Sequence, residues 1–195
     1  VISKSKTLAC NLYQEGFREN DLAVITLPSS EQFLFIMYAI TILRGKVAII
    51  DPEMGRVNSA AKLKQLQPRW AFVDSRILFL NEHPILRSAI SSLLKNIPYF
   101  KSPSGCRVIS TGKFIPTFRK YQRLAPLLAT KTELITLVRN DLPHEFIVVF
   151  TSGTVQGAKV VVHTFDSLTR SINHLTKIVG CEKNDLIGTE LPQYM

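Results

Sequence analysis

Six residues in one short stretch have the types that bind phosphate groups in proteins. They are Thr151, Ser152, Gly153, Thr154, Gly157 and Lys159. Glycines let backbone N–H groups approach an anion closely, hydroxyls add further donors, and a lysine supplies a mobile positive charge. The stretch therefore predicts a loop for nucleotide phosphates, although an ordinary hairpin turn can have the same composition.

The spacing within this stretch excludes two common nucleotide-binding motifs. Three residues separate Gly153 from Gly157, whereas a Walker A loop has four between its glycines, followed by Lys and Ser or Thr. The three-glycine spacing of a dinucleotide-binding turn is also absent. The β-branched runs 147–149 and 160–162 flank the stretch, so we expect a strand, a loop and a second strand.

Alternating strands and helices must position this loop. We expect strands at 22–27, 47–50, 70–73 and 107–110, and helices at 31–44, 57–67, 83–95 and 166–179. Ser30 and Asp166 are the expected N-caps, Gly45 and Gly180 the expected C-terminal stops, and a further strand is expected at 185–189. Short apolar strands that alternate with helices predict an α/β fold, a mostly parallel sheet with helices on both faces.

Composition places the chain among folded proteins. Its 195 residues are 46% hydrophobic, which is enough for a sizeable core in one domain or a large piece of one. The longest apolar run, Phe33–Leu43, is too short to span a bilayer, so we expect a helix buried on nearly all sides. No transmembrane segment or signal peptide is visible, which favours a cytoplasmic protein and leaves peripheral membrane contact open.

Cysteine and histidine usage argues against a disulfide framework and a metal site. Cys10, Cys106 and Cys181 are widely spaced and odd in number, so we expect free thiols in a reducing compartment. The four histidines show no metal-ligand spacing, either among themselves or with the cysteines. We therefore predict that this chain contributes no metal ligand.

Positive charge gathers in a connecting region at about 96–140, and between about 96 and 132 we expect long loops and one short helix. Residues 101–140 contain eight basic side chains and one acid, Glu133, within a chain of net charge +9. A solvated connecting region explains such a run, and so does a contact with a phosphate, a membrane surface or an acidic protein. Phe114, Phe118 and Tyr121 lie among the charges, but no nucleic-acid-binding motif accompanies them, so nucleic acid is not the expected partner.

The phosphate-type loop resembles the signature of one enzyme family, the AMP-forming adenylating enzymes. This family includes acyl-CoA synthetases, aryl-CoA ligases, peptide-synthetase adenylation domains and luciferases. Its usual motif is TSGTTGxPKG, preceded by Tyr or Phe. Residues 150–154 and Lys159 match the motif in place, and the family also has a helix where we expect one at 166–179.

A second segment that resembles the same family precedes the loop. Residues 20–51, NDLAVITLPSSEQFLFIMYAITILRGKVAIID, resemble a family stretch that ends in Asp-Pro, which here is Asp51-Pro52. The positions in register are Asp21, Leu27, Pro28, Ser30, Phe33, Gly45, Asp51 and Pro52. The phrase IIDPEMG, followed by LKQLQPRWAFVD, is most similar to fatty acyl-CoA synthetase-like members. By this resemblance, residues 1–195 are a single partial adenylation domain, the N-terminal portion of the family's large domain.

The resemblance implies a reaction. Family members use ATP and Mg²⁺ to activate a carboxylic acid as an acyl-adenylate, and then transfer the acyl group to a thiol such as coenzyme A. Residues 151–154 and Gly157 would hold the β- and γ-phosphates, and Lys159 would add charge. The family's adenine-binding segment, magnesium ligand, ribose-binding Asp and catalytic Lys have no counterpart here. We therefore expect no catalytic residue in this chain and no activity without the remainder of the enzyme.

Departures from the family motif leave two other interpretations open. Gln156, Ala158 and Val160 stand where the family has Gly, Pro and Gly. A degenerate member would bind nucleotide weakly or not at all and would serve as an interaction module. A basic module would instead bind acidic partners through residues 101–139.

Overall fold

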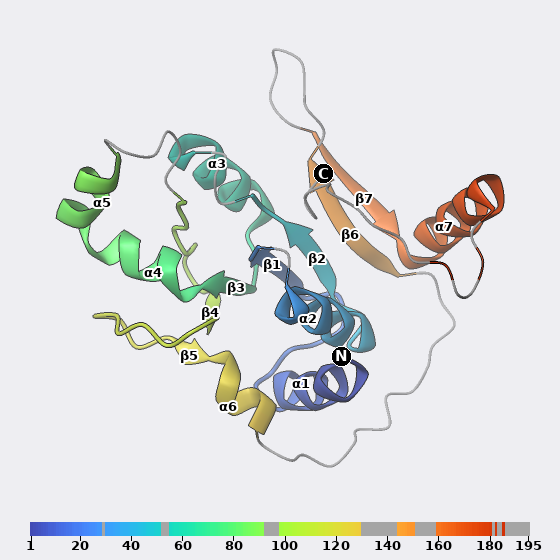
Figure 1. Ribbon diagram of the computed structural model, residues 1–195, viewed down its shortest axis with the longest axis horizontal. Coiled ribbons are helices and arrows are strands. Elements are labelled where there is room, and N and C mark those ends of the chain that lie inside the picture. Colours follow the sequence, from blue (N-terminus) through green and yellow to red (C-terminus); the bar gives the residue numbers. More distant parts are fainter. Residues whose placement is uncertain are drawn as a thin grey trace.

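A seven-stranded sheet forms the centre of the computed structural model (Figure 1). The structure describes residues 1–28, 30–51, 55–91, 98–129, 144–150, 159–180, 182 and 185. The helices are α1 (Ile2–Gln14), α2 (Glu31–Ile42), α3 (Arg56–Leu66), α4 (Ser75–Glu82), α5 (Pro84–Ser91), α6 (Leu124–Ala129) and α7 (Phe165–Val179). The strands are β1 (Leu22–Thr26), β2 (Lys46–Ile49), β3 (Trp70–Asp74), β4 (Arg107–Thr111), β5 (Gln122–Arg123), β6 (Glu145–Phe150) and β7 (Val160–Thr164).

The strand order is β5-β4-β3-β1-β2-β6-β7, and every neighbouring pair is parallel except β6 with β7. The chain moves from β1 to β2 on one side and then crosses to β3 on the other. Val24 of β1 is thereby in register with Ala48 of β2 and Ala71 of β3. The predicted α/β class and the mostly parallel sheet are confirmed.

Helices cover both faces of the sheet, as predicted. On one face α1, α2 and α6 pack over a core that includes Leu12, Ile36 and Leu127. On the other face α3 and α4 contribute Leu63 and Leu78 to a second core. In Figure 1, α1 and α6 lie below the strands and α3 lies above them. Because the inner strands are covered on both sides, β1 and β3 read as unbroken apolar runs rather than alternating ones.

One predicted N-cap and one predicted glycine stop are confirmed. The Ser30 hydroxyl accepts a hydrogen bond from the Phe33 amide at 3.2 Å and caps α2. Gly180 follows α7 with a φ of 70°, a left-handed conformation that suits glycine at a helix end. Strand β4 and helix α6 also lie where a strand and a short helix are expected, whereas most of the strand predicted at 185–189 lies outside the described residues.

Three helices differ from the prediction. The helix expected at 83–95 corresponds to α5, which begins at Pro84, and residues 92–95 lie outside the described residues. Helix α4 before it was not predicted, and Asp74 caps this helix by accepting a hydrogen bond from the Arg76 amide at 2.9 Å. Helix α1 was not predicted, and its buried residues include Leu8 and Leu12. Helix α2 is less enclosed than expected, since Leu34 and Tyr38 on its outer side are exposed.

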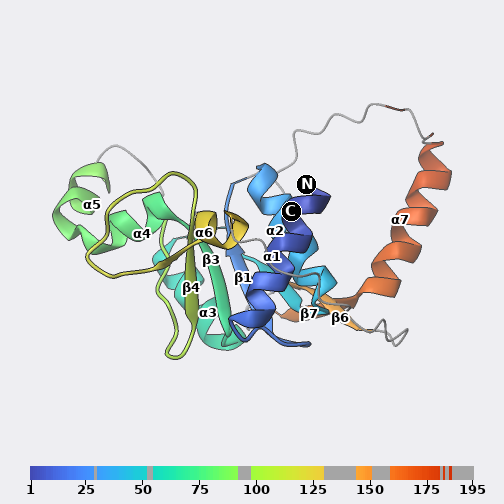
Figure 2. The ribbon, with the colours of Figure 1, turned by 90° about the horizontal axis from the view of Figure 1, so that it is seen from below.

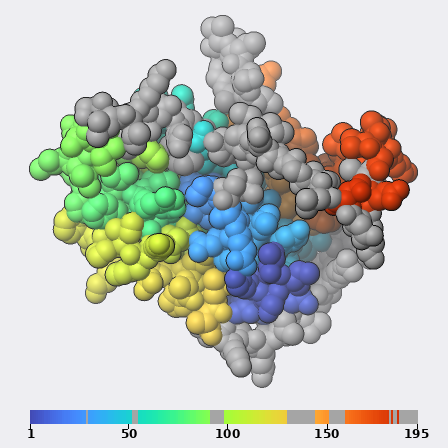
Figure 3. All heavy atoms as spheres, in the orientation of Figure 1, coloured from blue at the N-terminus to red at the C-terminus, as the bar shows by residue number. Residues whose placement is uncertain are grey.

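Helix α7 begins earlier than predicted and stands apart from the rest of the described chain. Thr164, rather than Asp166, is its N-cap, because β7 runs on to Thr164 and its hydroxyl accepts a hydrogen bond from the Ser167 amide at 3.1 Å. None of the residues of α7 is fully buried. Figures 2 and 3 show the helix projecting at one side of the molecule. No helix in the described part of the chain is long and apolar enough to cross a membrane.

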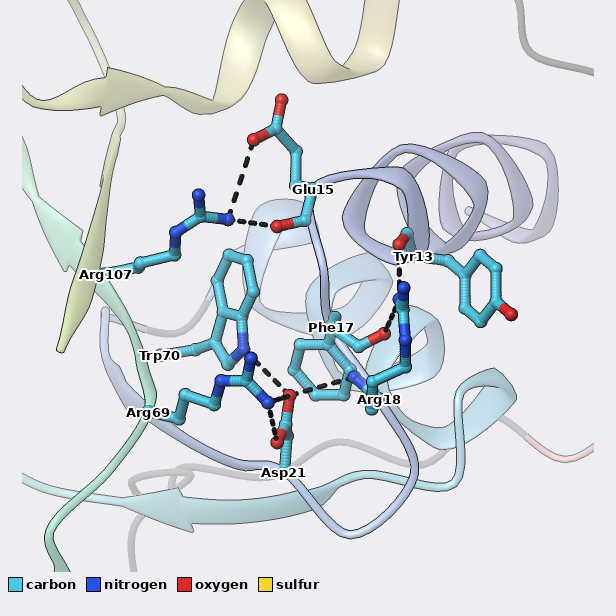
Figure 4. A network of polar contacts seen from close by, with 8 residues as sticks. All are labelled: Tyr13, Glu15, Phe17, Arg18, Asp21, Arg69, Trp70 and Arg107. Atoms are coloured by element: carbon cyan, nitrogen blue, oxygen red, sulfur yellow. Dashed lines mark hydrogen bonds and ion pairs between the residues drawn. The ribbon is translucent and has the colours of Figure 1, made fainter. Parts of the chain in front are cut away.

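Polar contacts fasten the amino-terminal ends of β1, β3 and β4 (Figure 4). Asp21, directly before β1, accepts hydrogen bonds from the Arg69 guanidinium at 3.0 Å and from the indole Nε1 of Trp70 at 3.1 Å. Arg107, the first residue of β4, lies over the buried Trp70 ring and donates a hydrogen bond to the Glu15 carbonyl oxygen. Asp21, one of the residues that match the family pattern, therefore has a structural role at this edge.

Candidate functional site

The hairpin of β6 and β7 holds the two ends of the predicted phosphate loop together. Phe150, the last residue of β6, is paired with Val160, the first residue of β7. Thr151, Ser152, Gly153, Thr154 and Gly157 lie outside the described residues, so their roles stay predictions. Lys159 is described and exposed, and because it precedes Val160 it lies next to the end of β6.

This hairpin mouth lies at the carboxyl edge of the sheet. Strand β6 runs parallel to β2, with Val47 opposite Ile147 and Ala48 opposite Val148. Phe150 therefore lies at the same edge as the carboxyl ends of β1, β2 and β3. Open α/β sheets bind their ligands outside this edge, so Phe150 and Lys159, the described residues that flank the predicted loop, lie where binding is expected.

A second lysine lies at the hairpin mouth. The ammonium of Lys62, on α3, is 4.6 Å from the centroid of the Phe150 ring. Burial lowers the pKa of Lys62, and the negative charge of Asp51, which follows β2, opposes this shift. The sequence contains no local signal for Lys62, because its position depends on how α3 packs across β2 and β6.

A separate hollow of about 830 Å³ opens at the carboxyl ends of β1, β3 and β4. It is lined by residues 27–28, 30–32, 74–76 and 112–115. Strand β1 leads to α2 on one face and β3 leads to α4 on the other, so the hollow lies at a switch point of the topology, where such sheets form ligand crevices. No sequence motif pointed to this hollow.

The walls of this hollow are mostly apolar, and an ion pair and a few other polar groups lie among them. Asp74 binds the Arg76 guanidinium through both oxygens, at 2.9 and 2.7 Å, and these hydrogen bonds raise the pKa of Arg76. The amide of Gly112 donates to the side-chain oxygen of Gln32 at 3.0 Å. Nearby, the buried hydroxyl of Thr111 has no hydrogen-bond partner among the described residues. The hollow thus offers donors and acceptors to a polar ligand.

The basic region is divided between structural and exposed side chains. Arg107 binds Glu15 and Trp70, and Arg123 lies over the Phe114 ring at 4.5 Å. The exposed basic residues within the described part of this region are Lys101, Arg107, Lys113, Arg119, Lys120 and Arg123. Lys131 and Arg139 lie outside the described residues. Part of the charge that suggested an acidic partner therefore holds the fold together.

The thiols and the metal-ligand side chains of the described residues give no sign of a disulfide or a metal cluster. Cys10 is buried, Cys106 is partly buried, and both are free thiols, as expected, whereas Cys181 lies outside the described residues. Among the described residues, His, Cys, Asp and Glu form no group of three that could hold a metal ion.

Several solved structures are similar to this one. A long-chain-fatty-acid-CoA ligase from Archaeoglobus fulgidus is 18% identical with a TM-score of 0.75, over 99% of this chain and 34% of that chain. The o-succinylbenzoate CoA synthetase of Bacillus subtilis, in complex with its acyl-adenylate intermediate, is 17% identical with a TM-score of 0.66. The match covers 99% of this chain and 42% of that chain. A luciferase-like enzyme from the nonluminescent mealworm Zophobas morio is 21% identical with a TM-score of 0.62. The match covers 83% of this chain and 34% of that chain.

These likenesses show the fold of the chain. No protein-family model and no curated protein sequence matches it. The expected resemblance to acyl-CoA synthetases and related adenylating enzymes is confirmed at the level of the fold. The chain spans less than half the length of each of these three structures.

Proposed function

We propose that this chain is the N-terminal portion of an ATP-dependent acid–thiol ligase that activates a carboxylic acid, of the fatty-acid type, as an acyl-adenylate. One observation carries the proposal. The TSGT…K stretch connects two paired strands at the carboxyl edge of a sheet whose fold is that of CoA ligases. The composition of the stretch and this position together support a phosphate-binding role.

The proposed role of the loop is to hold the nucleotide. Backbone N–H groups and hydroxyls of residues 151–154, with Gly157, would donate hydrogen bonds to the β- and γ-phosphates, and Lys159 would offset their charge. With the phosphates held in this way, a carboxylate oxygen of the acid attacks the α-phosphorus of ATP while the bond to pyrophosphate breaks. A thiol such as that of coenzyme A then displaces AMP from the acyl group.

The chain supplies only part of this chemistry. It spans less than half the length of the ligases it resembles, and we expect the remaining machinery, including any magnesium ligands, in another part of a longer enzyme. We therefore expect the isolated chain to bind nucleotide without adenylating activity. Acid-dependent exchange of labelled pyrophosphate into ATP by the isolated chain would contradict this expectation. We also expect the protein to be cytoplasmic.

Affinity for ATP tests the proposed site directly. Lys159→Ala should weaken the binding of Mg·ATP to the chain about tenfold, because a charge-assisted hydrogen bond is lost. The matched control is Lys177→Ala, which removes an exposed lysine of α7 and should leave affinity unchanged. Titration of both variants with a fluorescent ATP analogue measures the difference. Equal affinity of Lys159→Ala and the unchanged chain would remove the loop from the nucleotide site.

A degenerate, non-catalytic member is the second candidate, and Val160 favours it. The family has Gly at this position, whereas Val160 here begins β7, pairs with Phe150 and packs against the core beneath α3. A β-branched residue stiffens the strand at a point where glycine would free the backbone. An unchanged chain that shows no binding of ATP would support this candidate, in which the domain is an interaction module.

A basic module that binds acidic partners is the third candidate. The exposed lysines and arginines between Lys101 and Arg123 are the described part of its surface. Binding to anionic vesicles or to an acidic protein that weakens steeply with added salt would support it. Absence of such binding at low salt would remove it.

A further inference from the structure

We propose that Lys62 is a further phosphate-contacting residue of this chain, which together with Lys159 contacts a polyphosphate bound at the β6–β7 hairpin mouth. This inference rests on the nucleotide site proposed above and extends it to a residue far from the loop in sequence. No motif contains Lys62, and only the packing of α3 brings it to this place.

The position of Lys62 is fixed by its neighbours on α3. The Ser59 hydroxyl is buried and donates a hydrogen bond to the Tyr99 carbonyl oxygen at 3.2 Å. Leu63 is also buried, in the same core as Val148 of β6. With one side of α3 held against the sheet in this way, the side chain of Lys62 extends along the flank that faces the end of β6.

The ammonium of Lys62 contacts an aromatic ring at the end of β6. Its Nζ lies 4.6 Å from the centroid of the Phe150 ring, a distance at which the ring face attracts a cation. Phe150 is followed directly by Thr151 and is paired with Val160, the neighbour of Lys159. An anion at the hairpin mouth would therefore have a lysine on α3 and a lysine before β7 within reach.

The surroundings of Lys62 strengthen its attraction for an anion. The side chain is only partly exposed, and a charge that has lost some of its water interacts more strongly with an opposite charge. Burial of this kind is unfavourable for a cation unless a partner offsets it. Asp51 contributes a negative charge from the end of β2, and a phosphate would contribute a larger one.

A purely structural role for Lys62 makes a different prediction. In that case the methylene chain covers the Phe150 ring and the ammonium only reaches water. Methionine would then replace lysine without loss of ligand affinity, since it covers the ring equally well. The two roles are therefore separated by binding measurements rather than by stability.

The experiment compares three variants of the full 195-residue chain with inorganic tripolyphosphate and Mg·ATP as probes. Lys62→Met should weaken the binding of both probes about tenfold, since one charged donor is removed. Lys62→Arg should restore affinity to within about threefold, because arginine keeps the charge and also stacks on aromatic rings. Lys64→Met, a control on the exposed side of the same helix, should bind as the unchanged chain does.

The outcomes distinguish this inference from the proposed nucleotide site. Weaker binding by Lys159→Ala but unchanged binding by Lys62→Met would overturn the role of Lys62 and leave the nucleotide site standing. An unchanged chain that binds neither probe would overturn both. Circular dichroism melting confirms that each variant is folded, and a reduced salt dependence of tripolyphosphate binding in Lys62→Met would support loss of a direct charge contact.

Discussion

The carboxylate of Asp21 accepts a hydrogen bond from the indole Nε1 of Trp70 at 3.1 Å, across 49 residues of sequence. The same carboxylate binds the Arg69 guanidinium and the backbone amide of Arg18. Trp70 is fully buried, so its N–H group has no access to water in place of Asp21.

Asp21→Ala should lower the free energy of unfolding by about 1–3 kcal/mol, because a buried indole N–H group is left without an acceptor. Urea denaturation measures the loss. Glu19→Ala is the matched control, since Glu19 forms an ion pair with Arg44 and is 46% exposed, and its loss should cost about 0–1 kcal/mol. If the two variants were equally stable, the Asp21–Trp70 contact would not hold this edge.

Gly45→Ala should also destabilise the chain, for a steric reason. A Cβ atom at Gly45 would lie 2.6 Å from two ring carbons of Phe17 and 2.9 Å from a methyl group of Ile40. Overpacking of this kind costs about 1–3 kcal/mol. The double variant with Phe17→Leu tests the cause by denaturation: if the cost of Gly45→Ala were the same in both backgrounds, the ring would not be responsible.

The thiol of Cys106 should react slowly with alkylating reagents at pH 8. Burial raises the pKa of Cys106 to about 11, so little of the reactive thiolate is present at that pH. The rate of labelling by iodoacetamide at this residue, followed by peptide mass spectrometry, should rise as pH approaches about 11. Cys106→Ala identifies the signal of this residue.

The same raised pKa predicts how stability depends on pH. The unfolded chain releases this thiol proton at a lower pH than the folded chain, so the folded chain binds more protons above the ordinary thiol pKa. The free energy of unfolding should fall as pH rises from about 9 to about 11, and Cys106→Ala should show a smaller fall. An identical pH profile for both chains would contradict this prediction.

Helix α7 should open more readily than α2. Its side chains are all at least partly exposed, and Ile172, Leu175 and Val179 on its apolar side are each more than half exposed. Few buried contacts mean a low free energy of local opening. Hydrogen exchange should show protection factors at least about tenfold lower in α7 than in α2. Equal protection in the two helices would indicate that α7 is held by contacts that these exposures do not reflect.

Sequence patterns and structure agree best where a signal is local. The central residues of β1, β2 and β3 are apolar because both faces of the sheet are covered there. Ser30 caps α2 because its hydroxyl reaches an amide three residues later. The predictions were wrong where two local signals compete. Asp166 and Thr164 are both suitable N-caps, and the continuation of β7 decided in favour of Thr164.

The sequence by itself determined the order of most strands and helices, the class of the fold and the composition of the phosphate-type loop. Each of these depends on residues within a few positions of one another. Only the tertiary structure placed β1 between β2 and β3, joined Asp21 to Trp70 and brought Lys62 to Phe150. These contacts join residues that are distant in sequence, and strand pairing and helix packing select them by burying apolar surface that no local pattern specifies.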